Sequence, residues 1–186
     1  MGSDSDEDLV RSVLKGQVQD YARLVERYER PVYNLMYRYC RSDQEAADLS
    51  QDVFLRAYEK LSSFDGRRNF FPWLYTLAVN KAKDWQRSNS RKRLKLTQLH
   101  WEIPATGTRS HQEKQLLDQE EINSLYEALD ILPDLTREIV LLRYKQELTI
   151  RELTGIFQLS ESAVKMRIAR ALERMRSVLG RDRHEG

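Results

Sequence analysis

The segment TIRELTGIFQLSESAVKMRIARALERMR (149–176) constrains the fold of this chain more than any other stretch, because it contains the start signals of two helices. Thr149 followed by Glu152 is the capping-box pattern of a helix N-terminus, and Ser160 is a preferred cap for a second helix. Apolar residues at helical spacing mark the inner side of that second helix: Val164, Ile168, Ala171, Leu172 and Met175. The segment therefore predicts a helix-turn-helix whose turn lies near Gln158 to Ser160.

The outer side of the second predicted helix is cationic. It carries one acid, Glu173, and five basic residues: Lys165, Arg167, Arg170, Arg174 and Arg176. A helix that packs on one side and is cationic on the other fits the DNA major groove, where its side chains reach base edges and phosphates together. A solvated basic helix in a helical bundle is the alternative, and DNA binding is the favoured interpretation.

Composition and periodicity indicate an all-α chain with two domains. The 186 residues are enough for one medium domain or two small ones, and the low content of 7 Gly and 4 Pro favours helices. Periodicity fades between about 92 and 119, where Pro104 and Gly107 lie in a polar run typical of a linker. We therefore expect an all-α fold with a helical domain at 1–92, a flexible linker at 93–119 and a helix-turn-helix domain at 120–186.

Three helical runs are expected in the N-terminal domain. The first begins near Asp8 and continues to Tyr39, and Pro31 would kink or divide it because proline removes a backbone donor. The second covers 44–61. The third runs to about 91 after Asn69, a suitable cap.

The sequence lacks the patterns of several other protein classes. No stretch approaches the roughly 18 apolar residues of a membrane helix, and no secretion signal is visible. The single Cys40 fits a reducing cytoplasm and is expected to be a buried structural thiol. The three histidines are scattered along the linker and the tail, so no metal site is completed: His100, His111 and His184. We expect a cytoplasmic protein without membrane insertion, metal, cofactor, small-molecule substrate or clustered catalytic set.

Charge is segregated along the N-terminal domain, although the net charge is only +2. Residues 67–95 hold nine Lys or Arg residues and one acid, Asp84, whereas 43–52 holds four acids and no base. A basic block often indicates nucleic acid, and an acidic helix beside it suggests a basic protein partner.

Aromatic residues alternate with the cations of the basic block. Proteins commonly hold single-stranded nucleic acid in this way, at roughly 1–3 kcal/mol per stacked base. The alternative is that most of the rings belong to the core, and at least one of Phe71, Trp73 and Trp85 is expected there. Four residues share the outer face of the same predicted helix and are the favoured groove contacts: Asn80, Lys83, Asp84 and Arg87.

Three segments in this order resemble the bacterial sigma factors of the extracytoplasmic-function group. DLSQDVFLRAYEKLSSFD (48–65) resembles the polymerase-binding helix of that family, and FFPWLYTLAVNKAKDWQR (70–87) resembles its promoter-melting helix. The segment from 132 to 176 resembles its C-terminal domain. A helix-turn-helix alone is common, but the three motifs together are specific.

The resemblance assigns a role to each charged surface. It implies that Asp48, Gln51 and Asp52 dock on a basic coiled coil of the RNA polymerase clamp; their spacing places them on one helix face. Without the family, this acidic face would be read as solvated. The loop 64–69 together with Phe70 would capture a flipped base of the −10 element. The full set of implied −10 contacts is Arg67, Asn69, Phe70, Trp73, Asn80, Lys83, Asp84 and Arg87.

In the C-terminal domain the resemblance implies recognition of the −35 element. The implied readers are Lys165, Met166, Ala169 and Arg170, with Arg174 beside them and Arg167 nearer the DNA backbone or the core. The family often has glycine where this chain has Gln158. Gln158 either adopts a positive φ at a cost of roughly 1 kcal/mol, or the turn has a different shape.

These features predict a sigma factor that binds core RNA polymerase, directs it to promoter DNA and helps to melt the −10 region. The resemblance also implies control by an anti-sigma factor. Two alternatives remain open at this point. One is a stand-alone helix-turn-helix repressor or activator whose N-terminal domain dimerises or senses a ligand. The other is a protein-binding adaptor that no longer starts transcription, and enzymatic activity is a distant third.

Overall fold

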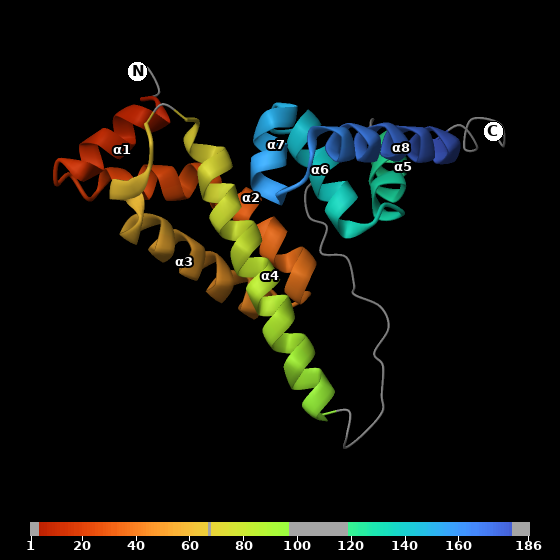
Figure 1. The fold of residues 1–186 in the computed structure, drawn as a ribbon, viewed down its shortest axis with the longest axis horizontal. Coiled ribbons are helices and arrows are strands. Elements are labelled where there is room, and N and C mark those ends of the chain that lie inside the picture. The colour runs from red at the N-terminus through yellow and green to blue at the C-terminus, as the bar shows by residue number, and fades with distance from the viewer. Residues whose placement is uncertain (1–3, 67, 97–118, 180–186) are drawn as a thin grey trace. The chain divides into compact units, whose positions relative to one another are not determined.

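A computed structural model describes residues 4–66, 68–96 and 119–179 of the chain. All its regular elements are helical, which confirms the expected all-α class for these residues. The chain divides into two compact units, Met1–Gly107 and Thr108–Gly186, which we call unit 1 and unit 2. In Figure 1 the helices of unit 1 run from red to yellow-green and those of unit 2 from teal to blue.

Unit 1 is built from four α-helices and a short 3-10 helix. Their bounds are α1 Asp6–Leu14, α2 Asp20–Cys40, α3 Asp43–Glu59, η1 Leu61–Ser63 and α4 Phe70–Leu96. Helix α2 packs on α1, α3 and α4, and α3 also packs on α4. The buried residues of α2 recur at helical spacing and form the centre of this core: Leu24, Val32, Leu35 and Met36.

Three details of unit 1 differ from the sequence-based expectation. The run expected from Asp8 to Tyr39 is interrupted at 15–19, between α1 and α2, where Gly16 has φ 100°. Pro31 lies inside α2 without dividing it, because packing of the apolar stripe on three neighbouring helices outweighs one missing hydrogen bond. Helix α4 continues to Leu96, so residues 93–96 are helical although the linker was expected to begin at 93. The rest of the expected linker, 97–118, lies outside the described residues.

Polar contacts at its N-terminal end tie α1 to α2. The Asp6 carboxylate accepts hydrogen bonds from Arg27 and from the Tyr28 hydroxyl, and Asp4 pairs with Arg23 at 2.5 Å. Burial and the Asp6 carboxylate both raise the pKa of Tyr28, so its hydroxyl remains a donor at neutral pH. The Tyr28 ring in turn stacks on Phe71 with ring centroids 5.1 Å apart. The N-terminal helix is therefore connected to the aromatic part of α4.

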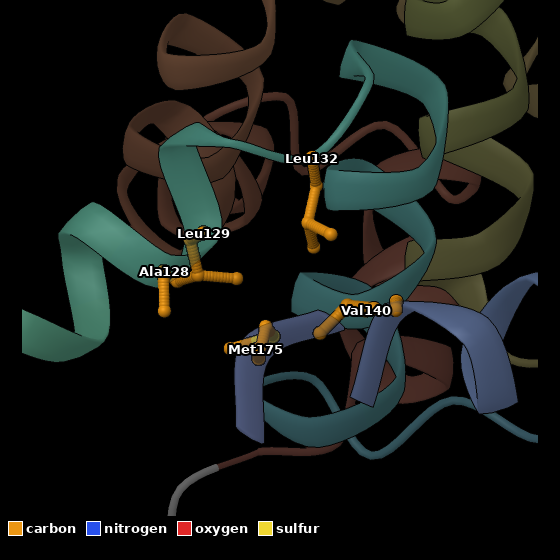
Figure 2. Close-up of a cluster of buried hydrophobic side chains, with 6 residues drawn as sticks. Ala128, Leu129, Leu132, Val140 and Met175 are labelled. Carbon is orange, nitrogen blue, oxygen red and sulfur yellow. The ribbon is translucent and has the colours of Figure 1, made fainter. Parts of the chain in front are cut away.

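Unit 2 contains α5 Gln119–Asp130, α6 Asp134–Tyr144, α7 Ile150–Phe157 and α8 Glu161–Leu179. Helix α8 packs on each of the other three helices. Side chains from α5, α6, α8 and the α5–α6 turn meet in one apolar cluster (Figure 2): Ala128, Leu129, Leu132, Val140, Ala171 and Met175. This cluster packs α8, the second helix of the helix-turn-helix, against α5 and α6.

Arg137 fastens the turn between α5 and α6. Its guanidinium donates to the carbonyl oxygens of Leu129, Asp130 and Leu132 at 2.8, 2.6 and 3.2 Å. The side chain is largely buried and also pairs with Asp130 and Asp134. One arginine thus adds donors to three carbonyl groups at the α5–α6 turn, of which the Leu129 carbonyl also accepts from the Leu132 N–H at 3.1 Å.

Candidate nucleic-acid interface

The helix-turn-helix forms with the caps that the sequence predicts. The Thr149 N–H donates to Glu152 Oε2 at 2.8 Å, and the Glu152 N–H donates to Thr149 Oγ1 at 3.2 Å, which confirms the capping box. Ser160 Oγ accepts from the Ala163 N–H at 3.2 Å at the start of α8. Gln158 has φ 56° and ψ 46°, so it takes the left-handed conformation that the sequence left as one of two options.

Helix α8 separates an apolar face from a cationic one. Val164, Ile168, Ala171 and Met175 are buried as expected, whereas Leu172 is only half-buried. The opposite face exposes the remaining candidate contacts: Lys165, Met166, Ala169, Arg170 and Arg174. Met166 is 51% exposed, which leaves a large apolar side chain open on a cationic surface. Because Ser160 caps the start of α8 and the opposite side of the helix is buried, this face points away from the core of unit 2.

Two cations of α8 have particular environments. Lys165 Nζ lies 3.4 Å from Glu161 Oε2 one turn earlier, an exposed pair that DNA phosphates can replace at little cost. Arg167 is half-buried, and its Nε is buried without a hydrogen-bond partner in the described part of the chain. This position agrees with an arginine at the border between core and surface.

The acidic residues of α3 form an exposed face in unit 1. Asp48, Gln51 and Asp52 are all exposed, while Val53 and Ala57 are buried on the other side of the helix. Asp52 Oδ2 accepts from Lys81 Nζ of α4 at 2.6 Å. The sequence interpretation did not include this ion pair.

An apolar residue extends the acidic face of α3. Leu55 lies one turn after Gln51 and is 63% exposed. Tyr58 near the end of the helix is also exposed, and its ring meets Tyr21 edge-on with ring centroids 5.1 Å apart. The exposed leucine could have been found from its spacing to Gln51, since it falls outside the buried stripe of the helix.

The aromatic residues at the start of α4 are mainly core residues. Phe70 is 1% exposed, and its ring lies 5.6 Å from Phe64 and 5.5 Å from Trp73. Phe71 and Tyr75 are also buried. The Phe70 ring is therefore not accessible to a flipped base, which differs from the expectation, because the rings of Phe64, Trp73 and Tyr28 pack around it. Trp73 is half-buried and keeps part of its indole accessible.

The polar face of α4 presents the other candidate contacts of unit 1. Asn80, Asp84 and Arg87 are exposed, and Lys83 is half-buried. Arg87 pairs with Asp84 at 3.4 Å, so the two side chains partly neutralise each other in the free chain. Asn69 is exposed and directly precedes α4, while Arg67 lies outside the described residues.

Other kinds of site receive little support from the described residues. Cys40 was expected to be buried, but it is only half-buried at the end of α2. Its partial burial still raises the pKa of the thiol, which lowers its reactivity. In the parts of the chain that the structure describes, no three His, Cys, Asp or Glu side chains gather into a metal-binding group. Within the same ranges, none of the helices combines the length and the apolar character needed to cross a membrane.

Comparisons with known proteins match both units. The family models for Sigma-70 region 2 and Sigma-70, region 4 match residues 24–92 and 128–177. The ECF RNA polymerase sigma factor SigW of Bacillus subtilis is 30% identical, covering 91% of this chain and 94% of SigW. The ECF RNA polymerase sigma-E factor of Escherichia coli is 31% identical, covering 91% of each chain.

A solved structure has a similar fold. The sigma factor RpoE of Bartonella quintana, in a complex with the anti-sigma factor NepR, aligns with a TM-score of 0.65 at 21% identity. The alignment covers 87% of this chain and 98% of that chain. The helical architecture described above therefore occurs in a sigma factor.

Proposed function

The chain belongs to the ECF RNA polymerase sigma factors, and from this membership we propose which of its surfaces bind polymerase and promoter. As a member of this family it is a transcription initiation factor that binds core RNA polymerase and directs it to promoter DNA. The observation that carries this assignment is the presence of region 2 and region 4, in that order, at residues 24–92 and 128–177.

The proposed polymerase contact is the acidic face of α3. It consists of Asp48, Gln51 and Asp52, whose exposed side chains share one side of the helix. A face with two exposed carboxylates, one of them paired with Lys81, suits the basic coiled coil of the polymerase clamp, because complementary charge speeds association and favours the correct partner. The exposed Leu55 beside it supplies apolar contact area.

The proposed −10 contacts lie on and before α4. They comprise Asn69, Trp73, Asn80, Lys83, Asp84 and Arg87, together with Arg67, which lies outside the described residues. The partly accessible Trp73 indole is the ring best placed to stack on an unpaired base. Phe70 packs on Trp73 from the core. We propose that it affects DNA binding indirectly, by setting the position of the Trp73 ring.

The proposed −35 contacts lie on the exposed face of α8. Lys165, Arg170 and Arg174 offer cations to phosphates and base edges, and Met166 and Ala169 offer apolar contact. Arg167, at the border between core and surface, is proposed to contact the DNA backbone. Because several cations meet phosphates, binding is expected to weaken steeply with salt.

The proposed division of labour follows the two units. We propose a melting domain at 1–92 and a −35 reader at 120–186. The segment between α4 and α5 connects them. The chain adds no catalytic chemistry of its own in this proposal, because the polymerase makes the RNA. It works in the cytoplasm, where the polymerase is, and an anti-sigma factor restrains it, as NepR binds RpoE in the similar structure.

The proposed function can be tested with core polymerase and a library of random promoter sequences. Purified chain should give sequence-specific transcripts, and sequencing of the active templates should recover two conserved elements. A chain that yields no specific transcript from any template in the library would contradict the assignment.

A charge-reversal variant tests the proposed polymerase contact. Asp48→Lys with Asp52→Lys should abolish co-purification with core polymerase and leave binding to duplex DNA intact. Glu26→Lys with Glu29→Lys on α2 makes the same change of charge at two exposed positions and is the matched control. Equal loss in both variants would assign the effect to net charge and not to the face of α3.

A further inference from the structure

One ion pair joins the two proposed binding surfaces of unit 1. Lys81 of α4 donates to Asp52 of α3 at 2.6 Å, and the side chains are 29% and 54% exposed. Asp52 belongs to the proposed polymerase-binding face, whereas α4 carries the proposed −10 contacts. A partner that engages one of these side chains therefore changes the environment of the other.

Lys81 lies at the border of the promoter-facing side of α4. It follows Asn80 directly and precedes Asp84 by three residues, so both exposed side chains lie within one turn of it. Its ammonium group points to α3 and is neutralised by Asp52. A lysine paired with a carboxylate attracts a phosphate less than an unpaired lysine does.

We propose that Lys81 is a further promoter-contact residue, which Asp52 holds in the free chain and which core polymerase releases. The inference rests on the proposed function, because it requires Asp52 to pair with the basic clamp. When a cation of the clamp takes the place of Lys81 at Asp52, the lysine becomes available to a DNA phosphate. By thermodynamic linkage, DNA that engages Lys81 strengthens the contact between Asp52 and polymerase by the same factor.

The size of this coupling follows from the exposure of the pair. Partly exposed ion pairs shift an equilibrium by about two- to fivefold. An effect of this size favours promoter binding by the polymerase-bound chain over promoter binding by the free chain. It also leaves both binding steps reversible.

The decisive variant is Lys81→Gln, because it removes the internal competitor for Asp52. Its affinity for core polymerase, measured by competition with labelled wild-type chain, should rise by about two- to fivefold. A pair that only supports the packing of α3 on α4 would give an unchanged or lower affinity. Lys81→Arg keeps the pair and should behave as the wild type.

Combined variants separate release of Asp52 from a general effect of charge. The increase should vanish when Asp52→Asn is already present, and it should persist with Asp48→Asn, where the pair is intact. Lys15→Gln makes the same substitution at an exposed position of unit 1 and should not change the affinity. An increase that persists in the Asp52→Asn background overturns the proposal.

The contribution of Lys81 to DNA binding is measured as the affinity of holoenzyme for a labelled promoter fragment selected from the random library. Lys81→Gln should lower the affinity for that fragment and reduce the slope of log affinity against log salt by about one. An undiminished slope overturns the proposal. A wild-type chain that fails to bind core polymerase is a different result, which would contradict the proposed function itself.

Discussion

The two units present their candidate contacts to DNA in different ways. In unit 2, Arg170 and Arg174 project from a helix whose N-terminal cap, Ser160, and buried stripe already set the direction of its outer face. In unit 1, Asp52 is paired with Lys81, and Trp73 packs on neighbouring rings. A reader of duplex DNA can be fully formed before binding, whereas a surface for separated strands must first give up internal contacts.

From this difference we expect unit 1 to melt promoter DNA only together with polymerase. Ring contacts such as those among Phe64, Phe70 and Trp73 contribute roughly 0.5–1.5 kcal/mol each beyond their burial. Rearranging them for an unpaired base therefore opposes DNA binding by the free chain. We expect unit 2 to bind duplex DNA on its own more readily than unit 1 captures an unpaired base.

The largest expected effect separates a core residue of unit 1 from a surface residue of unit 2. Phe70→Ala should lower the free energy of unfolding of unit 1 by about 3–5 kcal/mol, because it leaves a cavity among rings. Met166→Ala, on the exposed face of α8, should change stability by less than about 0.5 kcal/mol. Urea unfolding followed by far-ultraviolet circular dichroism measures both, since the three tryptophans of the chain all lie in unit 1 and their fluorescence would report that unit alone. Similar small losses of stability in the two variants would contradict the burial of the Phe70 ring.

Arg137 is the corresponding structural residue of unit 2. Arg137→Ala should destabilise this unit by about 2–3 kcal/mol, because three carbonyl groups at the α5–α6 turn lose the guanidinium donor. Of these, the Leu129 carbonyl keeps a second donor, the Leu132 N–H at 3.1 Å. Faster amide hydrogen exchange in α5 and α6 than in the wild type would show the effect within the full chain. Arg151→Ala, at an exposed position of α7, is the control. A loss that spreads equally to unit 1 would mean that the two units do not unfold separately.

The cationic face of α8 is expected to act mainly through charge. Arg170→Ala should weaken binding of the selected promoter duplex by about 1–2 kcal/mol and reduce the salt slope by about one. Met166→Ala should weaken it without changing the slope, because methionine releases no counterion. Fluorescence anisotropy at several salt concentrations measures both quantities. An identical slope for Arg170→Ala and wild type would place Arg170 away from the phosphates.

The smallest expected effect concerns the turn between α7 and α8. Gln158→Gly should stabilise unit 2 by about 0.5–1 kcal/mol, because glycine adopts φ 56° without the steric cost of a Cβ. Gln158→Ala keeps the Cβ and should be nearly neutral. Hydrogen exchange in α7 and α8 can resolve this difference. A destabilising glycine would indicate that the Gln158 side chain makes contacts that outweigh its backbone strain.

The helix-turn-helix follows from patterns that span only a few residues. Thr149, Glu152 and Ser160 predict two helix starts, and the hydrogen bonds of both caps are present. The positive φ of Gln158 was one of two options for a turn without glycine. These features need no knowledge of the rest of the chain, since each cap satisfies backbone groups within its own first turn.

Helix lengths were less predictable than helix starts. Pro31 suggested a break in α2, and fading periodicity suggested an early end of α4. Both signals describe the local preference of the chain. Long helices gain most of their stability from packing, and packing on neighbours can carry a helix through a position of poor propensity.

Burial and pairing in unit 1 depend on residues that are far apart in the chain. Phe70 and Trp73 occupy the same basic and aromatic context in the sequence, yet Phe64 and its neighbours cover only Phe70 completely. Asp48 and Asp52 are equivalent by composition and spacing, but the packing of α3 on α4 brings Lys81 to Asp52. Periodicity indicates which side of a helix is apolar. It does not specify which neighbouring helix meets that side, and therefore not which ring is covered or which charge is neutralised.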